Sequence, residues 1–267
     1  MTKIKNSVVL VTGASSGIGA AAAREMARRG GRVALLARTR DALEKVAAEI
    51  AAEGGEARAY SVDLADAEAV DRAAKAIREE MGTPEVVVNN AGAGRWLFVE
   101  ETSPEEMGQM MAVPYFAAFY VTRAFLPDML KRGRGHFVSV GSPASLIPWP
   151  GAAAYSAARW AFHGFTEALR ADLYGTGLRV TLVIAGKVDS PYWEHNPGSE
   201  ERAPKIARLI PTLTLEQVAD ALVRAVEGNR RQVIVPFMLW LFAATYRFFP
   251  RPVEWLVYST GWRRSHG

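Results

Sequence analysis

Short apolar runs alternate with longer segments of helical periodicity along most of this chain of 267 residues. The runs, most of them rich in valine, leucine and isoleucine, occupy residues 8–12, 32–37, 56–62, 85–90, 136–140, 179–184 and 233–236. Continuous apolar strands separated by helices indicate a parallel sheet that is covered on both faces. We therefore predict an α/β fold of one domain with seven strands.

The composition excludes several classes of function. With 49% hydrophobic and 22% charged residues, the chain can bury a sizeable core. It has no cysteine, which excludes disulfides, thiol catalysis and thiolate metal sites. Its four histidines lack the spacing of metal ligands, so we expect no metal centre. No stretch approaches the roughly 20 apolar residues of a membrane span, and we expect a cytoplasmic protein.

A glycine-rich turn, TGASSGIG, follows the first predicted strand and opens the first helix. Glycines allow the backbone to turn sharply there, and the free N–H groups at the start of the helix can bind a pyrophosphate. In this strand–turn–helix context the turn predicts a dinucleotide site. The residues expected to contact the dinucleotide are Gly13, Ser15, Ser16, Gly17, Ile18 and Gly19.

The end of the second predicted strand indicates which dinucleotide is bound. Enzymes that use NAD normally place Asp or Glu there, where it accepts a hydrogen bond from the ribose 2′-hydroxyl. This chain instead has Ala37 followed by Arg38. A guanidinium is a better partner for a 2′-phosphate than for a hydroxyl, so we predict NADP(H) as the cofactor.

A candidate acid/base lies in the stretch YSAAR, where Tyr155 precedes Arg159 by one helical turn. Residues four apart on a helix share a face, and a nearby cation stabilises a tyrosine in its ionised form. Such a tyrosine can serve as a general acid or base. Ser142, thirteen residues upstream of Tyr155, can donate a hydrogen bond to a developing oxyanion.

These stretches, together with Asp63-Leu64 and NNAG at Asn89–Gly92, resemble the short-chain dehydrogenase/reductase family over about residues 7–235. The resemblance implies a Rossmann-type doubly wound sheet and hydride transfer between a nicotinamide and a carbonyl carbon. It also implies that Tyr155 moves the proton while Ser142 holds the substrate oxygen. Further cofactor contacts that it implies come from Asp63, Leu64, Asn90, Ala91, Gly92, Tyr155, Arg159, Gly186, Val188 and Ser190.

Three positions depart from the family pattern. Arg159 replaces the usual lysine, Pro114 replaces an asparagine that supports the same proton relay, and Ala185 replaces a proline. Arginine keeps the positive charge but holds its proton, so it cannot pass one along. Pro114 removes an N–H from a predicted helix and is expected to kink it. Two interpretations remain open: an enzyme with an altered relay, or a catalytically impaired NADP(H)-binding protein that acts as a sensor or interaction module.

The predicted substrate side is rich in bulky apolar residues. These side chains favour a small hydrophobic alcohol or ketone over a sugar, although they could also be packed aromatics without contact to substrate. The residues expected to bind the substrate are Trp96, Pro143, Trp149, Tyr192 and Trp193.

The last 31 residues differ from the rest, and we predict a Rossmann domain over residues 1–236 and an aromatic, basic extension over 237–267. The extension has nine aromatic residues and four arginines against one glutamate. It could pack on the protein, on a partner subunit or over the substrate pocket, or it could lie in a membrane interface. We expect no nucleic-acid binding, because no basic stripe lies outside this tail. The resemblance further implies a homodimer or homotetramer built on the helices predicted at 104–131 and 153–175.

Overall fold

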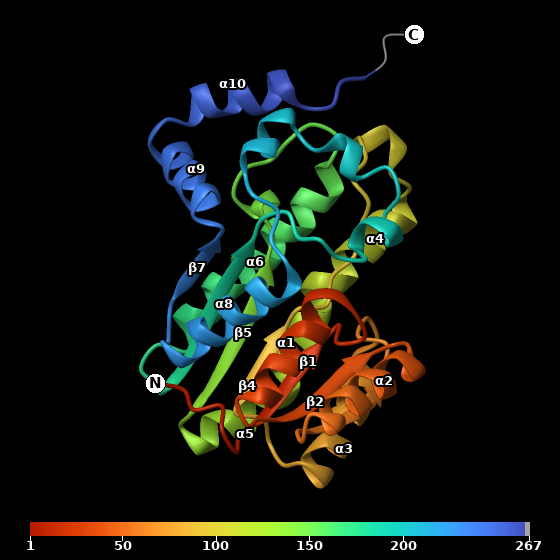
Figure 1. Ribbon diagram of the computed structural model, residues 1–267, viewed down its shortest axis with the longest axis vertical. Coiled ribbons are helices and arrows are strands. Elements are labelled where there is room, and N and C mark those ends of the chain that lie inside the picture. Colours follow the sequence, from red (N-terminus) through yellow and green to blue (C-terminus); the bar gives the residue numbers. More distant parts are fainter. Residues whose placement is uncertain (265–267) are drawn as a thin grey trace.

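The computed structural model describes residues 1–264 and places all seven predicted strands in one parallel sheet (Figure 1). The order across the sheet is β3-β2-β1-β4-β5-β6-β7, so the chain reverses its direction of winding between β1 and β4. This confirms the predicted Rossmann-type doubly wound fold. The strands are β1 (Val8–Thr12), β2 (Arg32–Ala37), β3 (Glu56–Ser61), β4 (Val86–Asn89), β5 (Gly135–Gly141), β6 (Leu178–Ala185) and β7 (Gln232–Val235).

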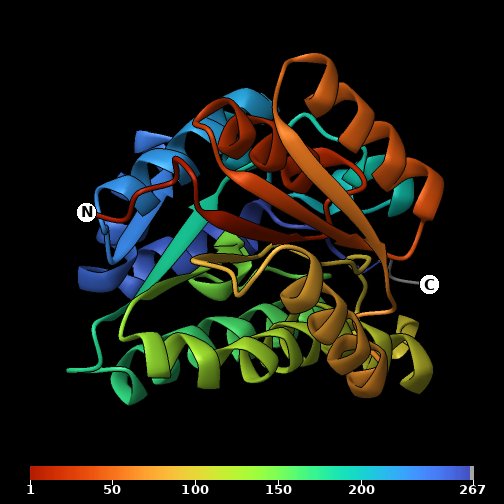
Figure 2. The same cartoon turned by 90° about the horizontal axis from the view of Figure 1, so that it is seen from below.

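Helices cover both faces of the sheet, as Figure 2 shows end-on. One layer contains α1 and α8, which pack against each other, with α2 beside α1; the other contains α3, α5 and α6. The helices are α1 (Gly17–Arg28), α2 (Arg40–Ala52), α3 (Ala67–Glu80), α4 (Pro104–Met111), α5 (Ala117–Arg132), α6 (Ala153–Asp172), α7 (Tyr192–His195), α8 (Leu215–Glu227), α9 (Phe237–Phe248) and α10 (Pro250–Thr260). Short 3-10 turns occupy Val99–Glu101, Pro143–Ser145, Glu200–Arg202 and Lys205–Leu209.

The central strands are apolar along their whole length because both of their faces are buried. In β1 every residue is buried, with Val9 and Val11 packed toward the layer of α1 and α8 and Val8 and Leu10 toward that of α3 and α5. Alternate residues of a strand point to opposite faces, which accounts for this division. Polar side chains are therefore found beyond the ends of the strands, where they can form a site at the carboxyl edge of the sheet.

A network of hydrogen bonds joins the ends of β1 and β4 at that edge. The Thr12 hydroxyl accepts from the backbone N–H groups of Asn90 (2.9 Å) and Ala91 (3.1 Å) and donates to the Val88 carbonyl (3.2 Å). The Asn90 side-chain amide donates to the Thr12 carbonyl at 3.0 Å. The glycine-rich turn is therefore held at a fixed position relative to the NNAG segment.

The helix predicted over residues 104–131 is interrupted at Pro114, as expected. Helix α4 ends at Met111, and a π-helical segment (Ala112–Phe116) leads into α5. Val113, which precedes the proline, has φ −130° and ψ 89°, because the proline ring disfavours helical geometry in the residue before it. The Val113 carbonyl accepts a hydrogen bond from the Ala93 N–H at 3.3 Å. The break thus ties this helix to the loop after β4.

The C-terminal extension folds back onto the carboxyl edge of the sheet as two helices, α9 and α10 (Figure 1). Leu239 of α9 is buried against Leu182 and Ile184 of β6, and Val253 and Val257 of α10 are buried beside Ile147. Of the placements left open by the sequence, the structure shows packing on the chain's own core. No helix among residues 1–264 is long and apolar enough to cross a membrane.

Candidate active site

A cavity of about 1330 Å³ runs along the carboxyl edge of the sheet, from the glycine-rich turn to helix α9. Its position is the one expected in a doubly wound sheet, at the point where the strand order reverses. The structure places nearly every predicted site residue on its walls. These are Gly13, Ser15, Ser16, Gly17, Ile18, Arg38, Asp63, Leu64, Asn90, Ala91, Gly92, Trp96, Ser142, Pro143, Trp149, Tyr155, Arg159, Gly186, Val188, Ser190, Tyr192 and Trp193.

Gly19 is the one predicted cofactor residue that does not line the cavity. It lies beneath the turn, where a Cβ would come within 2.1 Å of the Gly13 carbonyl oxygen and 2.6 Å of the Asn90 side-chain nitrogen. Because Gly19 has only a hydrogen atom in place of a side chain, α1 can lie close to the loop after β4. By contrast, Gly13 and Gly17 line the cavity with φ of +65° and +56°, the left-handed region that glycine adopts at little cost.

The end of β2 presents an unpaired cation to the cavity. Arg38 lines the cavity, its side chain is exposed, and it forms no ion pair within residues 1–264. Arg40, two residues later, is instead paired with Glu44 at 2.7 Å and is not part of the lining. The Arg40 guanidinium is therefore held by a carboxylate of its own helix, α2. Asp63, at the end of β3, accepts from the Ala65 N–H at 3.0 Å and helps to shape the same wall.

The candidate catalytic hydroxyls meet near the middle of the cavity. Tyr155, in the first turn of α6, donates to the Ser142 hydroxyl oxygen at 3.2 Å. Ser142 follows directly after β5, and its hydroxyl oxygen also accepts from the Ala144 N–H at 3.2 Å. Tyr155 is only 6% exposed. A group bound between the two hydroxyls could therefore accept a proton from Tyr155 and form a hydrogen bond with Ser142.

Arg159 lies on the same face of α6 as Tyr155, as predicted, but it contacts the ring of the tyrosine. Its guanidinium carbon lies 4.9 Å from the centre of the Tyr155 ring, a cation–π arrangement. The side chain is 7% exposed, and its buried Nε has no hydrogen-bond partner among the described residues. Its terminal nitrogens would lie 2.7 Å from a Cβ at Gly92, so a side chain at that position would displace the guanidinium. A buried cation without a carboxylate partner is costly, so the arrangement indicates a site prepared for an acceptor.

Tyr192 is close to Tyr155 but is held in a different way. Its hydroxyl donates to the Gly94 carbonyl at 2.6 Å and accepts from Trp96 Nε1 at 3.1 Å. Burial raises the pKa of Tyr192, and the neighbouring Tyr155 raises it further. Tyr192 is therefore a neutral phenol, and its two hydrogen bonds hold this part of the cavity wall in place.

An aromatic wall borders the two tyrosines. The ring of Trp96 packs edge-on against Trp149 at 4.8 Å and Trp193 at 5.5 Å, measured between ring centres. The Trp193 Nε1 donates to the Val188 carbonyl, whereas Trp149 Nε1 is buried without a partner among residues 1–264. The indole N–H of Trp149 is thus a hydrogen-bond donor in a mostly apolar wall.

Two residues that the sequence analysis missed join this wall to the loop after β4. Asn196, buried and on the cavity, accepts from the Gly94 N–H at 3.2 Å and donates to the Tyr192 carbonyl at 2.8 Å. The fully buried Ser199 accepts from the Trp96 N–H at 3.0 Å. The bonds to Gly94 and Trp96 join residues about a hundred positions apart, so no local sequence pattern predicts them.

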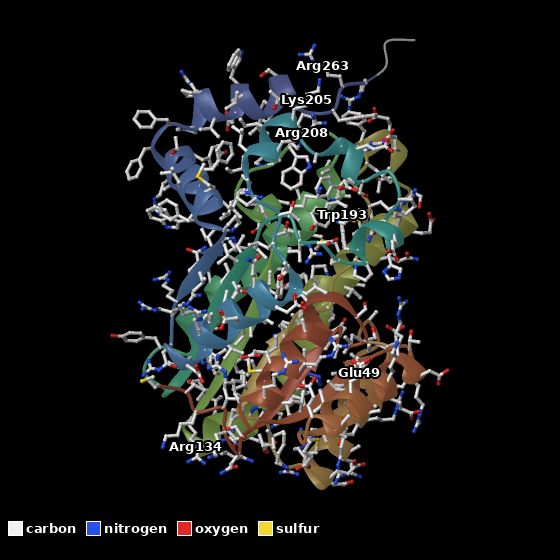
Figure 3. All side chains as sticks on the ribbon, viewed as in Figure 1. Glu49, Arg134, Trp193, Lys205, Arg208 and Arg263 are labelled. Atoms are coloured by element: carbon white, nitrogen blue, oxygen red, sulfur yellow. The ribbon has the colours of Figure 1, made fainter. Side chains whose placement is uncertain are left out.

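Beyond the aromatic wall the cavity continues as an apolar arm. We use this name for the part lined by Ile206, Ala207, Leu209, Ile210, Met238, Leu241, Phe242 and Val257. These residues come from the 3-10 turn at Lys205–Leu209 and from helices α9 and α10, so the C-terminal extension forms part of the cavity roof. Figure 3 shows the labelled Trp193 in the space between this roof and the sheet.

Comparison with known proteins assigns the fold and the motifs to one family. The family model for short chain dehydrogenases matches residues 7–200. A 1-deoxy-11-beta-hydroxypentalenate dehydrogenase of Streptomyces exfoliatus is 39% identical over 193 residues, 70% of each chain. A metagenomic short-chain oxidoreductase solved with NADP is 33% identical, with a TM-score of 0.73 over 86% of this chain and 97% of that one.

The extension is also part of a known fold. A short chain dehydrogenase/reductase from Burkholderia phymatum has a TM-score of 0.85 and covers 99% of this chain and 100% of its own. At 23% identity this likeness concerns the fold alone.

The chain belongs to the short-chain dehydrogenase/reductase family, and it is an oxidoreductase of that type. The family uses nicotinamide cofactors, which confirms the expected class of cofactor and of small-molecule chemistry. Among residues 1–264 no group of three or more His, Cys, Asp or Glu is arranged to hold a metal ion.

Proposed function

We propose that this protein is an NADP(H)-dependent oxidoreductase that interconverts a carbonyl and an alcohol on a hydrophobic small molecule. The observation that carries the proposal is the Tyr155 hydroxyl at 3.2 Å from the Ser142 hydroxyl, inside a cavity continuous with the glycine-rich turn. A buried tyrosine of purely structural role would not need a serine partner and a cation at the same cavity wall.

The residues present fit a phosphorylated nicotinamide cofactor. The unpartnered Nε of Arg159 and its contact with Gly92 suit hydrogen bonds to ribose hydroxyls on that wall. The exposed Arg38, which forms no ion pair among residues 1–264, suits a 2′-phosphate, and the end of β2 (Ala37 to Thr39) has no carboxylate that could bind a ribose 2′-hydroxyl instead. That a related oxidoreductase was solved with NADP supports the same choice.

In the proposed reaction the cofactor, when bound, supplies a hydride to the carbonyl carbon or accepts one from the alcohol. Ser142 donates a hydrogen bond to the substrate oxygen and holds it beside Tyr155. In the direction of reduction the Tyr155 hydroxyl gives its proton to that oxygen as the alcohol forms; in oxidation the phenolate takes the proton back. Arg159 lies over the Tyr155 ring, with its guanidinium carbon 4.9 Å from the ring centre, and places a positive charge at this wall.

Arginine keeps its proton, so the proton that Tyr155 gives up must be restored by another route. Pro114 removes the helical asparagine that the family uses in this relay, and the segment Ala112–Phe116 is no longer α-helical. We infer that water in the open part of the cavity reprotonates Tyr155. This interruption also favours the second candidate function, an NADP(H)-binding protein that turns over slowly or not at all.

The substrate side supports an extended apolar substrate. The aromatic wall and the apolar arm offer few polar partners, among them the free Trp149 Nε1. A compact sugar would leave its hydroxyls unsatisfied in such a lining.

We further propose a homo-oligomer through the face formed by α5 and α6. Phe119 and Trp160 are 43% and 50% exposed there, beside the partly buried Phe165. The charges near this face are paired: Arg123 lies 3.4 Å from Asp71, and Glu167 accepts from Arg231 at 2.7 Å. An apolar patch with a neutralised rim is suited to a second copy of the same surface.

The decisive experiment measures NADPH consumption with a panel of ketones of increasing chain length. It compares the wild type with Arg159→Lys and Tyr155→Phe, and it records NADPH binding by fluorescence in parallel. We expect turnover in the first two proteins and not in the third. Binding of NADPH without turnover in both the wild type and Arg159→Lys would leave the second candidate as the function.

A further inference from the structure

The outer side of the C-terminal extension is covered with exposed aromatic residues. Phe237, Phe248 and Trp255 are 68%, 76% and 71% exposed, and Phe237 stacks on Trp240 with ring centres 5.4 Å apart. Figure 3 shows rings that project outward from both helices. We call this surface the aromatic face; it consists of Phe237, Trp240, Leu241, Phe248, Phe249, Trp255 and Tyr258. An exposed patch of this kind marks an interaction site.

Exposed cations that form no ion pair among residues 1–264 lie on the elements that carry the aromatic face, just after α10 and on the neighbouring turn. They are Lys205, Arg208, Arg247, Arg251 and Arg263. Figure 3 places Lys205, Arg208 and Arg263 at the same end of the molecule as α10. The one carboxylate of α9 and α10, Glu254, accepts a hydrogen bond from the Tyr246 hydroxyl at 3.1 Å. Helices α9 and α10 and the turn at Lys205–Leu209 therefore carry an excess of positive charge, which favours an anionic partner.

The apolar arm of the cavity reaches this same surface. Leu209, Met238 and Leu241 line the cavity, yet they are 67%, 43% and 44% exposed. One side of α9 thus faces the cavity while the adjoining side belongs to the aromatic face. The arm opens beside that face, at the end of the cavity away from the glycine-rich turn.

We propose that the aromatic face lies in the interface of a lipid bilayer that carries anionic headgroups, with the mouth of the apolar arm against the lipid. Aromatic rings with arginines around them are the composition of a helix that lies in this interface. Helix α9, with 12 residues, is about 18 Å long and cannot span the ~30 Å hydrocarbon layer. The membrane contact itself does not depend on the proposed function. Only its consequence rests on that function: a lipid-dissolved alcohol or ketone can enter the arm directly.

The distribution of charge favours a bilayer over a second copy of the chain. In an isologous dimer the same patch meets itself, so Arg247 and Arg251 of both copies would come together. Glu254 is the only carboxylate of α9 and α10 available to neutralise them. An anionic lipid surface instead attracts each such cation, at about 1 kcal/mol per residue.

The test is sedimentation of the full-length protein with vesicles of phosphatidylcholine alone or mixed with phosphatidylglycerol. We expect the wild type to bind the mixed vesicles and to bind pure phosphatidylcholine much more weakly. The double variant Arg247→Gln, Arg251→Gln should bind the mixed vesicles roughly 30-fold more weakly. The triple variant Trp240→Ser, Phe248→Ser, Trp255→Ser should lose binding to both.

Two controls separate this surface from nonspecific attraction. Arg134→Gln removes an exposed cation at the opposite end of the molecule (Figure 3), and Tyr174→Ser removes an aromatic ring that is 92% exposed elsewhere. Both should bind vesicles as the wild type does. Circular dichroism and NADPH binding must be unchanged in every variant that is compared.

The proposal is overturned if the wild type does not sediment with anionic vesicles, or if the control variants lose as much binding as the variants of the aromatic face. It is also overturned if the triple variant converts a dimer to a monomer in analytical ultracentrifugation, because the face would then be a subunit interface. Turnover of a short, water-soluble ketone is measured without vesicles. Failure of that assay would count against the proposed function and not against the membrane contact.

Discussion

The two ends of the cavity are built in contrasting ways. At the cofactor end, backbone groups and glycines at the ends of β1 and β4 form the walls, and the Thr12–Asn90 hydrogen bonds fix their positions. At the substrate end, aromatic side chains from loops and from the C-terminal helices form the walls. The difference teaches that the walls of the cofactor end are set by the strand ends and their turns, while the walls of the other end depend on side chains from segments far along the chain.

The largest effect is expected where the two ends meet, at Tyr155. Tyr155→Phe removes the proton donor but keeps the ring against which Arg159 packs, so kcat should fall at least ~100-fold while NADPH still binds. Steady-state kinetics and fluorescence titration measure the two quantities. Tyr192→Phe is the matched control: it should change KM more than kcat, because the Tyr192 hydroxyl is occupied by Gly94 and Trp96. Equal losses of kcat in the two variants would contradict the assignment.

The next effect concerns the cofactor end alone. Arg159→Met removes a charge that we propose to bind ribose hydroxyls, and charge-assisted hydrogen bonds contribute about 1.5–3 kcal/mol. The Kd for NADPH should therefore rise roughly 10- to 100-fold. Arg159→Lys should bind NADPH within a few-fold of the wild type. If the methionine variant binds NADPH as tightly as the wild type, the buried guanidinium has another role.

A smaller change at the same end should alter only the choice between two cofactors. Arg38→Asp replaces the unpaired cation at the end of β2 with the acceptor that a ribose 2′-hydroxyl prefers. We expect the ratio of kcat/KM for NADPH to that for NADH to fall by about 10- to 100-fold, mostly through KM. Arg40→Asp serves as the control, since Arg40 is paired with Glu44 outside the cavity. An unchanged ratio for Arg38→Asp would show that the 2′-phosphate is bound elsewhere.

The smallest effect is expected at the substrate end. Ala207→Phe fills part of the apolar arm, and it should raise KM about 10-fold for ketones with a long apolar chain. Short ketones, which do not reach the arm, should keep their KM, and the Kd for NADPH should not change. A rise in KM for short and long ketones alike would show that the substitution disturbs the aromatic wall rather than the arm.

The parts that could be predicted from sequence are those in which a residue's task is set by its neighbours along the chain. The strands follow from continuous runs such as VVLVT, the turn follows from glycines between a strand and a helix, and the pairing of Tyr155 with Arg159 follows from helical spacing. The break at Pro114 was likewise a local consequence of the proline ring. Each of these rests on backbone geometry over a few residues.

Other features depended on contacts that no local pattern encodes. The sequence placed the Arg159 charge near Tyr155 but not over its ring, and it gave Gly19 a place at the cofactor that the structure assigns to close packing beneath the turn. The anchors of the substrate wall, Asn196 and Ser199, bond to residues about a hundred positions away.

By itself, the sequence determined the parallel α/β sheet, the glycine-rich strand–turn–helix and the placing of Tyr155 and Arg159 on one helix face, because periodicity and motif spacing act over short distances. Only the tertiary structure decided that Arg159 is buried without a counter-ion among residues 1–264, that Arg38 rather than Arg40 faces the cavity, and that the C-terminal helices roof an apolar arm. Those outcomes depend on which surfaces meet when distant segments fold together, since burial and pairing are properties of the packed molecule.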